Sequence, residues 1–186
     1  MSTESARPQR ADARRNRARV LAVAQQVFEA EGLGVTVDDV ARRAGVGVGT
    51  VYRHFPTKEA LFEAIVAARV AQLAQDAKAL AAADDPGAAF FDFFEMMIKK
   101  VALNKAFGEA LSAAGRDLSE ISRTSGQMVQ EAQALLLKRA QDAGAVRADL
   151  TPAELKAVVV GIVTMERHLD GEPGRLTKIV LSALRT

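Results

Sequence analysis

The chain has 186 residues, enough for one ordinary domain or for a small module fused to a larger one. Hydrophobic residues make up 49% and charged residues 26%, the balance of a globular protein with a hydrophobic core. Cysteine is absent, which excludes disulfides, thiolate metal sites and cysteine nucleophiles. No apolar run approaches the ~18 residues of a membrane span, and the arginine-rich N-terminus lacks the apolar stretch of a secretory signal. We therefore expect a cytoplasmic location and no membrane partner.

Positive charge is concentrated towards the N-terminus. Residues 1–58 contain ten Lys/Arg and six Asp/Glu, whereas residues 59–186 contain fifteen and seventeen. An arginine cluster opposed only by Asp12 comprises Arg7, Arg10, Arg14, Arg15, Arg17 and Arg19. Such a cluster is either a solvated tail or an arm that binds phosphates.

The first element is predicted to be an amphipathic helix. Residues 1–12 are polar and irregular, and we expect them to form a flexible basic arm. The helix should begin at Asp12 or Ala13 and end at about Glu31, before Gly32. Its apolar face recurs at three- and four-residue spacing through Val20, Leu21, Ala24, Val27 and Phe28.

Two short helices follow, joined by a turn that contains glycine. Thr36 can cap the first helix, with Asp39 as the reciprocal partner of a capping box, and Gly45 ends it. The second short helix covers about residues 48–55 and is broken by Pro56. Two short helices around a tight turn are typical of a helix-turn-helix.

The rest of the chain is also predicted to be helical. Further helices are expected at residues 57–73, 86–104, 127–143, 155–169 and 176–184, with Met128, Ala132, Leu135, Leu136 and Arg139 on one face of the third. Thr57 can cap the first of these helices, and Thr151 with Glu154 gives the strongest capping signal. Residues 105–126, rich in serine and glycine, suggest shorter helices or frayed turns. The sequence thus predicts an all-α fold of about nine helices.

The second short helix carries the pattern expected of a DNA-reading element. Val51 and Phe55 are four residues apart and can face the core, which turns the other side chains outward. The outward set is Gly49, Thr50, Arg53 and His54, and Tyr52 can reach a phosphate or a thymine methyl group. Helix-turn-helix geometry also occurs in proteins that never touch DNA, so the pattern alone leaves the function open.

A family resemblance is carried by the stretch from Thr36 to Phe62, TVDDVARRAGVGVGTVYRHFPTKEALF. It resembles the signature of the TetR family of regulators, and the preceding VFEAEG segment matches as well. The resemblance covers about residues 14–73. It implies a helix-turn-helix DNA-binding domain that binds double-stranded operator DNA, followed by a helical ligand-binding and dimerisation domain.

The resemblance and the arginine arm together imply a set of DNA-binding residues. These are Arg14, Arg15, Arg17, Val37, Asp38, Gly47, Val48, Gly49, Thr50, Tyr52, Arg53, His54 and Lys58. Gly47 stands where the family often has serine, and Val48 and Gly49 offer no hydrogen bonds to base edges. We therefore expect specificity from Thr50, Arg53, His54 and the arginines.

Phenylalanines and methionines of the later helices have two interpretations. They are either an ordinary core stripe or the lining of a small-molecule pocket. The pocket that the resemblance implies would be lined by Phe62, Phe90, Phe93, Phe94, Met97, Phe107, Met128 and Met165. A lining this apolar predicts a largely hydrophobic effector.

The last two predicted helices are too apolar to face solvent alone. The run from Val158 to Val163 is apolar around most of the helix girth, which requires burial on two sides. Either it packs within one subunit, or it forms a two-fold four-helix interface that spaces two recognition helices about 34 Å apart. The interface would contain Val158, Gly161, Ile162, Met165, His168 and Ile179.

An enzyme is the main rival class. The only histidines are His54 and His168, and Glu166 lies two residues from His168, which suits neither a dyad nor a metal pair on a helix. No G-x-S-x-G elbow is present. We expect no enzymatic activity, no cofactor and no metal.

The sequence thus predicts an all-helical homodimer in three parts. Residues 1–12 form the flexible arm, residues 13–75 the helix-turn-helix domain, and residues 76–186 the effector-binding and dimerisation domain. The expected function is transcriptional regulation, with repression relieved by a small, largely hydrophobic ligand. The alternatives are a dimeric small-molecule-binding protein with a vestigial DNA module, or an enzyme.

Overall fold

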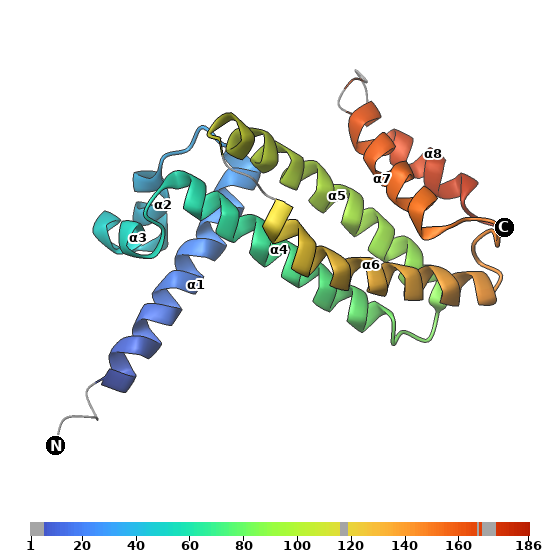
Figure 1. The fold of residues 1–186 in the computed structure, drawn as a ribbon, viewed down its shortest axis with the longest axis horizontal. Helices are drawn as coiled ribbons and strands as arrows, with labels where there is room; N and C mark the ends of the chain where they lie inside the picture. Colours follow the sequence, from blue (N-terminus) through green and yellow to red (C-terminus); the bar gives the residue numbers. More distant parts are fainter. Residues whose placement is uncertain (1–5, 116–118, 167, 169–173) are drawn as a thin grey trace. The chain divides into compact units, whose positions relative to one another are not determined.

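The computed structural model describes residues 6–115, 119–166, 168 and 174–186, with the backbone alone at residues 6–11, 103 and 119–126. These residues form eight helices, one fewer than expected, and a single β-bridge between Val146 and Arg185 (Figure 1). The helices are α1 (Ala6–Glu31), α2 (Val37–Ala44), α3 (Val48–His54), α4 (Lys58–Leu80), α5 (Pro86–Ala113), α6 (Ser119–Asp142), α7 (Pro152–Glu166) and α8 (Arg175–Ala183). The all-α prediction is confirmed. Within the described residues, no helix is long and apolar enough to cross a membrane.

The chain divides into two compact units. The first contains residues 1–66 with 110–116, and the second contains residues 67–109 with 117–186. Helix α4 is continuous through the boundary at Val66 and contains neither glycine nor proline. The domain boundary expected near residue 75 also falls within α4.

Three helix starts are capped as the sequence predicts. The backbone N–H of Asp39 donates to Thr36 Oγ1 (3.2 Å), and the Thr36 N–H donates to Asp39 Oδ2 (3.3 Å), which completes the capping box of α2. At α4, Thr57 Oγ1 accepts a backbone N–H at 3.1 Å. At α7, the Thr151 N–H donates to Glu154 Oε2 (2.8 Å), and the Glu154 N–H donates to Thr151 Oγ1 (3.3 Å). Local chemistry alone therefore sets these boundaries.

Other boundaries differ from the prediction. Helix α1 begins at Ala6 rather than near Asp12, and Pro8 is compatible with this start because its missing N–H is not needed in the first turn. The remainder of the expected arm, residues 1–5, lies outside the described residues. Helix α7 is described to Glu166, and its predicted end at Leu169 lies outside the described residues.

The region expected to hold short helices or frayed turns is instead divided between two long helices. Helix α5 continues to Ala113 and α6 begins at Ser119. Phe107 and Leu111 are 1% and 0% exposed, so their burial outweighs the cost of about 1 kcal/mol for a glycine such as Gly108 inside a helix.

The first unit is built on contacts among α1, α2 and α3 (Figure 1). Its buried side chains are Val20, Ala24, Val27, Phe28, Val37, Val40, Ala41, Ala44, Val51, Phe55, Leu61, Phe62, Ile65, Val66 and Leu111. Phe28 of α1 and Phe62 of α4 meet edge to face with ring centroids 5.1 Å apart. This small core fixes the helix-turn-helix on its flanking helices.

The second unit is a helical bundle with a continuous hydrophobic core from α4 to α8. In α6, Leu136, Leu137 and Ala140 are buried, whereas Met128 and Leu135 are 60% and 50% exposed. The predicted face of this helix was therefore partly wrong, because its apolar residues surround the helix and only packing against α4, α5 and α7 selects the inner side.

Candidate nucleic-acid interface and effector region

Helix α3 exposes the side chains that a DNA-reading helix needs. Val51 and Phe55 are 0% and 2% exposed and anchor α3 in the first unit. On the opposite side Tyr52 is 45% exposed and Val48 41%. Gly47, Gly49 and Arg53 are exposed, and Thr50 and His54 are half-buried. Val51 and Phe55 face inward as the spacing of the sequence predicts, whereas Thr50 and His54 of the predicted outward set are only partly exposed.

The turn before α3 leaves its backbone open to a close partner. Gly45 has φ of 64°, the left-handed conformation that ends α2 and turns the chain. Gly47 caps α3 without a side-chain hydrogen bond, and a Cβ at Gly49 would meet nothing within 4 Å. An incoming phosphate can thus approach the first N–H groups of α3.

Two residues at the start of α2 that are predicted to contact DNA differ in their exposure to solvent. Asp38 is exposed, but Val37 is only 6% exposed and packs inward. The Val37 side chain is therefore not available to DNA, and any contact there is through the backbone. Hydrogen bonds from the Thr36 side chain and backbone hold the pKa of the Asp39 carboxyl below its ordinary value.

Lys58 has a structural contact that the sequence did not reveal. Its Nζ donates to the backbone oxygen of Leu33 at 2.7 Å, in the loop between α1 and α2. The same ammonium lies 5.8 Å from the Phe28 ring centroid and 5.5 Å from that of Phe62. To bind a phosphate, the Lys58 ammonium would have to give up these contacts inside the first unit.

The arginines of α1 differ in what they touch. Arg14, Arg15 and Arg17 are all exposed. Arg15 pairs with Asp12 on the same helix. The Arg17 guanidinium lies 5.0 Å from the ring centroid of Phe55, directly after α3, so Arg17 joins α1 to the recognition element.

An ion pair that the sequence did not predict ties α1 to α2. Arg43 Nη2 donates to Glu31 Oε2 at 2.8 Å, and Arg43 Nη1 contacts the other carboxylate oxygen. This hydrogen-bonded guanidinium holds the pKa of the Glu31 carboxyl below its usual value. No local motif signals the pair, because the two residues are twelve positions apart.

The residues of the predicted effector lining fall into a buried set and an exposed set. Five of its members, Phe90, Phe93, Phe94, Met97 and Phe107, are at most 5% exposed in the second unit. Phe62 belongs to the core of the first unit. Met128 and Met165 are 60% and 47% exposed. The core-stripe interpretation therefore describes the five buried residues in this conformation.

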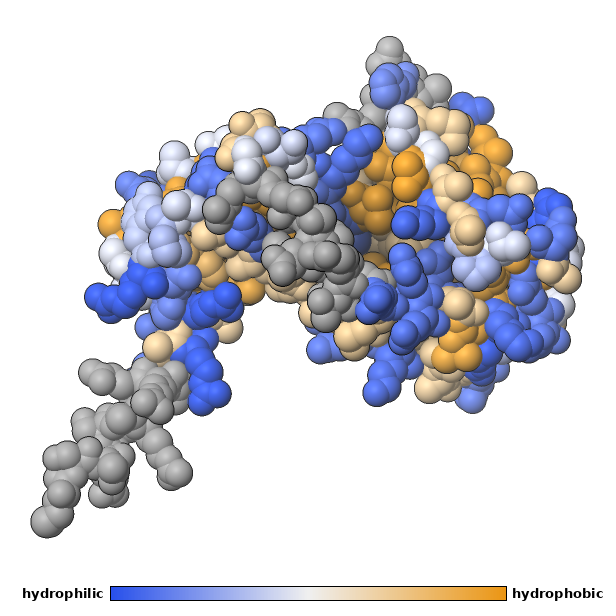
Figure 2. Space-filling model, viewed as in Figure 1, coloured by the Kyte–Doolittle hydropathy of each residue, from blue (hydrophilic) through white to orange (hydrophobic). Residues whose placement is uncertain are grey.

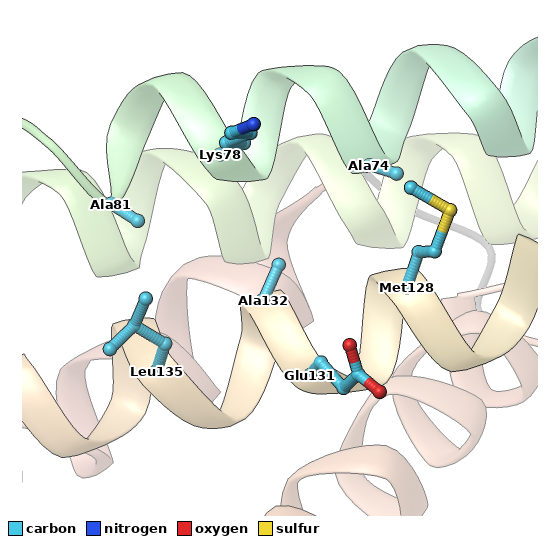
Figure 3. A pocket seen from close by; sticks show the side chains of 7 residues that line it. All are labelled: Ala74, Lys78, Ala81, Met128, Glu131, Ala132 and Leu135. Carbon is cyan, nitrogen blue, oxygen red and sulfur yellow. The ribbon is translucent and has the colours of Figure 1, made fainter.

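A surface groove of about 260 Å³ lies between α4 and α6 (Figure 3). It is lined by Ala74 and Lys78 of α4, by Ala81 directly after that helix, and by Met128, Glu131, Ala132 and Leu135 of α6. Of the predicted lining only Met128 contributes to it. Alanines on both helices make the groove, because they leave space that larger side chains would fill.

The residues of α7 and α8 that are predicted to form the dimer interface differ in their exposure to solvent. Ile162 is 0% exposed and belongs to the subunit core, so its side chain is not available to a partner. Met165 and Ile179 are 47% and 53% exposed, as is the unpredicted Val160 at 53%. Val158 and Gly161 are half-buried and His168 is exposed, with its Nδ1 2.8 Å from the Thr164 oxygen. Figure 2 shows hydrophobic residues at the surface in the region of α7 and α8.

Glu166 has a role that the sequence did not indicate. Its carboxylate accepts the backbone N–H of Gly174 (3.0 Å) and of Thr177 (3.0 Å), and so caps α8 from α7. These backbone hydrogen bonds hold the pKa of Glu166 below its ordinary value. The contact explains how α7 and α8 are held together at this end.

Taken together, the exposed α3, its basic neighbour α1 and the separate helical bundle define a DNA-binding regulator of the helix-turn-helix class. Residues 20–65 match the family described as bacterial regulatory proteins, tetR family. Residues 85–186 match the C-terminal domain described as transcriptional regulator SbtR-like. The chain belongs to the TetR family of transcriptional regulators, whose members are transcription factors and not enzymes.

Solved structures agree over nearly the whole chain. A TetR transcription regulatory protein from Mycobacterium vanbaalenii is 43% identical, covers 96% of this chain and all of its own, and has a TM-score of 0.76. A TetR transcriptional regulator from Streptomyces coelicolor is 34% identical, with 91% and 98% coverage and a TM-score of 0.73.

The curated relatives match a shorter stretch of the chain. The HTH-type transcriptional regulator TtgW of Pseudomonas putida is 42% identical over 65 residues, which are 34% of this chain and 48% of that protein. The chain thus matches about half the length of TtgW, and 29% of an HTH-type regulator from Staphylococcus aureus that is 40% identical over 53 residues.

Proposed function

We propose that the protein is a homodimeric repressor that leaves its operator when a small molecule binds to the second unit. The observation that carries the DNA-binding part is the orientation of α3. Val51 and Phe55 fasten its inner side, while Tyr52 and Arg53 face solvent. A helix held in this way can enter the major groove without unfolding its own core.

Within this proposal the contacts fall into two kinds. Thr50, Arg53 and His54 read base edges, because Val48 and Gly49 have no polar side-chain atoms. Arg14, Arg15 and Arg17 bind phosphates or the minor groove, together with Gly47 and Tyr52 near the backbone. The Asp38 carboxylate repels phosphates, so Asp38 contacts the DNA backbone only through its own N–H at the start of α2. This division assigns specificity to the middle and end of α3.

The remaining parts of the proposal concern assembly and control. Residues 13–75 form the DNA-binding domain and residues 76–186 the effector and dimerisation domain, with any flexible arm before them. Two subunits join through the α7–α8 face, which supplies the two-fold axis that an operator with two half-sites requires. The effector acts as a population shift, binding better to a conformation of low operator affinity.

The experiment is a selection of genomic fragments with the purified protein, followed by binding titrations on the selected duplex. Arg53→Ala should weaken specific binding by about 10- to 100-fold and relax the base preference at one position of each half-site. Lys138→Ala, which removes an equal charge from an exposed site on α6, should leave both unchanged. Equal affinities of the Arg53→Ala variant and the parent protein would overturn the assignment.

A further inference from the structure

Among the described residues of the second unit, two amide side chains have buried atoms for which the described part of the chain supplies no hydrogen-bond partner. Gln133 of α6 is only 7% exposed, and its Nε2 is buried and unpaired. Asn104 of α5 is half-buried, and its Oδ1 is likewise buried and unpaired. Because roughly 90% or more of buried polar groups in proteins are hydrogen-bonded, these two atoms require an explanation.

Both amides border the same hydrophobic core. Gln133 lies between Val129 and Leu136 on the inner side of α6, one turn from each, and both of these residues pack in the core of the second unit. Asn104 follows Val101 by one turn of α5, and Val101 packs against the same core. An Nε2–H donor and an Oδ1 acceptor are thus offered at the edge of an apolar interior.

The surface groove reaches the residue next to Gln133. Ala132 lines the groove between α4 and α6 and also packs against the core (Figure 3). The buried Arg69 has a separate contact, since its guanidinium lies 4.9 Å from the ring centroid of Phe107. This cation–π contact offsets part of the cost of burying the Arg69 charge.

We propose that Gln133 and Asn104 determine the specificity of the effector site. The ligand is an apolar molecule that carries a carbonyl acceptor for Gln133 Nε2–H and a hydroxyl donor for Asn104 Oδ1, as in a hydroxy ketone or a hydroxy ester. This inference rests on the proposed effector control. It replaces the largely hydrophobic effector expected from the Phe and Met residues with an amphipathic one.

An unsatisfied buried amide lowers the stability of the free protein. Binding sites commonly retain such destabilising groups because the ligand needs them. Gln133→Met has a similar volume without the donor, and should therefore raise the melting temperature by about 2–4 °C. Gln130→Met on the exposed side of α6 is the matched control and should change it little. A fall in melting temperature for Gln133→Met would show that the amide is satisfied in the free protein and would overturn the proposal.

Binding is tested on the full-length protein without DNA, by calorimetry with three eight-carbon probes. Ethylbenzene has no polar group, 2-octanone has an acceptor, and 4-hydroxy-2-octanone has an acceptor and a donor. Each added group should strengthen binding to the parent protein by about ten-fold. Gln133→Met should abolish the gain from the ketone, and Asn104→Leu the gain from the hydroxyl.

Equal affinities for the three probes, or gains that survive in both variants, would contradict the proposal, as would a lack of binding by all three. Operator titrations with the hydroxy ketone separate this inference from the proposed function. Probe binding that depends on Gln133 but leaves operator affinity unchanged would reject effector-controlled repression while supporting the assigned site chemistry.

Discussion

At the scale of single residues, Lys58 shows how a contact can change the meaning of a motif position. The family resemblance assigns this lysine to phosphate binding. In the structure its ammonium satisfies the Leu33 carbonyl and lies beside two aromatic rings. A hydrogen bond from a charged group to a buried or partly buried acceptor contributes more than a neutral one.

Lys58→Met keeps the apolar stem and removes the ammonium. We predict a loss of about 1 kcal/mol in the free energy of unfolding, measured by urea denaturation, because the Leu33 carbonyl loses its donor. The slope of log affinity for operator against log salt concentration should stay the same. A slope reduced by about 0.9 with unchanged stability would instead assign Lys58 to a phosphate.

Glu31 provides a second prediction at this scale, through pH. Its folded-state pKa is lowered by the Arg43 hydrogen bond, so the folded protein binds fewer protons than the unfolded chain. The stabilisation is complete above the ordinary glutamate value of 4.5 and is lost as the pH falls through the lower folded-state value. Glu31→Gln should therefore destabilise the protein at pH 7 and flatten the loss of stability below pH 4.5, in urea titrations at several pH values.

The matched control for this pH prediction is Glu95→Gln, since Glu95 is exposed and has no ion pair among the described side chains. It should leave the acid limb of the stability profile unchanged. An equally steep acid limb in the Glu31→Gln variant would show that the ion pair does not contribute to folding.

At the scale of elements, the α7–α8 pair depends on the Glu166 cap. Glu166→Ala removes the acceptor of the Gly174 and Thr177 N–H groups at the start of α8. We predict that these amides exchange with deuterium faster while amides of α5 do not, because the first turn of α8 frays. Thr151→Ala, which uncaps α7 instead, is the comparison; the same protection pattern in both variants would contradict a specific role for Glu166.

Elements were predictable from sequence wherever the determining chemistry is local. Thr36, Thr57 and Thr151 cap their helices as expected because a cap and its partner lie within four residues. The continuation of α5 through Gly108 was not predictable in this way. It depends on the burial of Phe107, and burial is decided by helices distant in sequence.

The residues of the candidate site likewise divide into those that local spacing predicts and those that depend on contacts distant in sequence. The outward set on α3 could be read from the spacing of Val51 and Phe55. The buried Gln133 could have been found only by recognising that a polar residue occupies an inner position of α6, whose inner side the sequence left ambiguous. Contacts such as Lys58–Leu33 and Arg43–Glu31 join residues whose separation carries no periodic signal.

At the scale of the whole molecule, the proposed binding to an operator with two half-sites requires two subunits to assemble. Val160, Met165 and Ile179 leave large apolar side chains exposed on α7 and α8. Solvent-exposed apolar groups of this kind are characteristic of a surface that is covered in an oligomer. The proposed two-fold interface makes the affinity for an operator with two half-sites depend on this face.

Ile179→Lys places a charge in the proposed interface, where burying it would be costly. We predict a shift from dimer to monomer in analytical ultracentrifugation and a parallel loss of operator affinity. Leu135→Lys is the matched control, because Leu135 is 50% exposed and Ile179 is 53% exposed. A dimer that persists in the Ile179→Lys variant and dissociates in the Leu135→Lys variant would move the interface to α6.

The uninterrupted helix α4 also sets a rule for building hybrid sensors from this protein. Helix α4 contains no glycine or proline between Lys58 and Leu80, the residues at which helices usually kink. One inserted residue rotates everything downstream by about 100°, whereas seven residues restore the phase to within about 20°. A foreign sensing domain grafted after Val66 should therefore transmit its signal only in linker lengths that recur with the helical repeat.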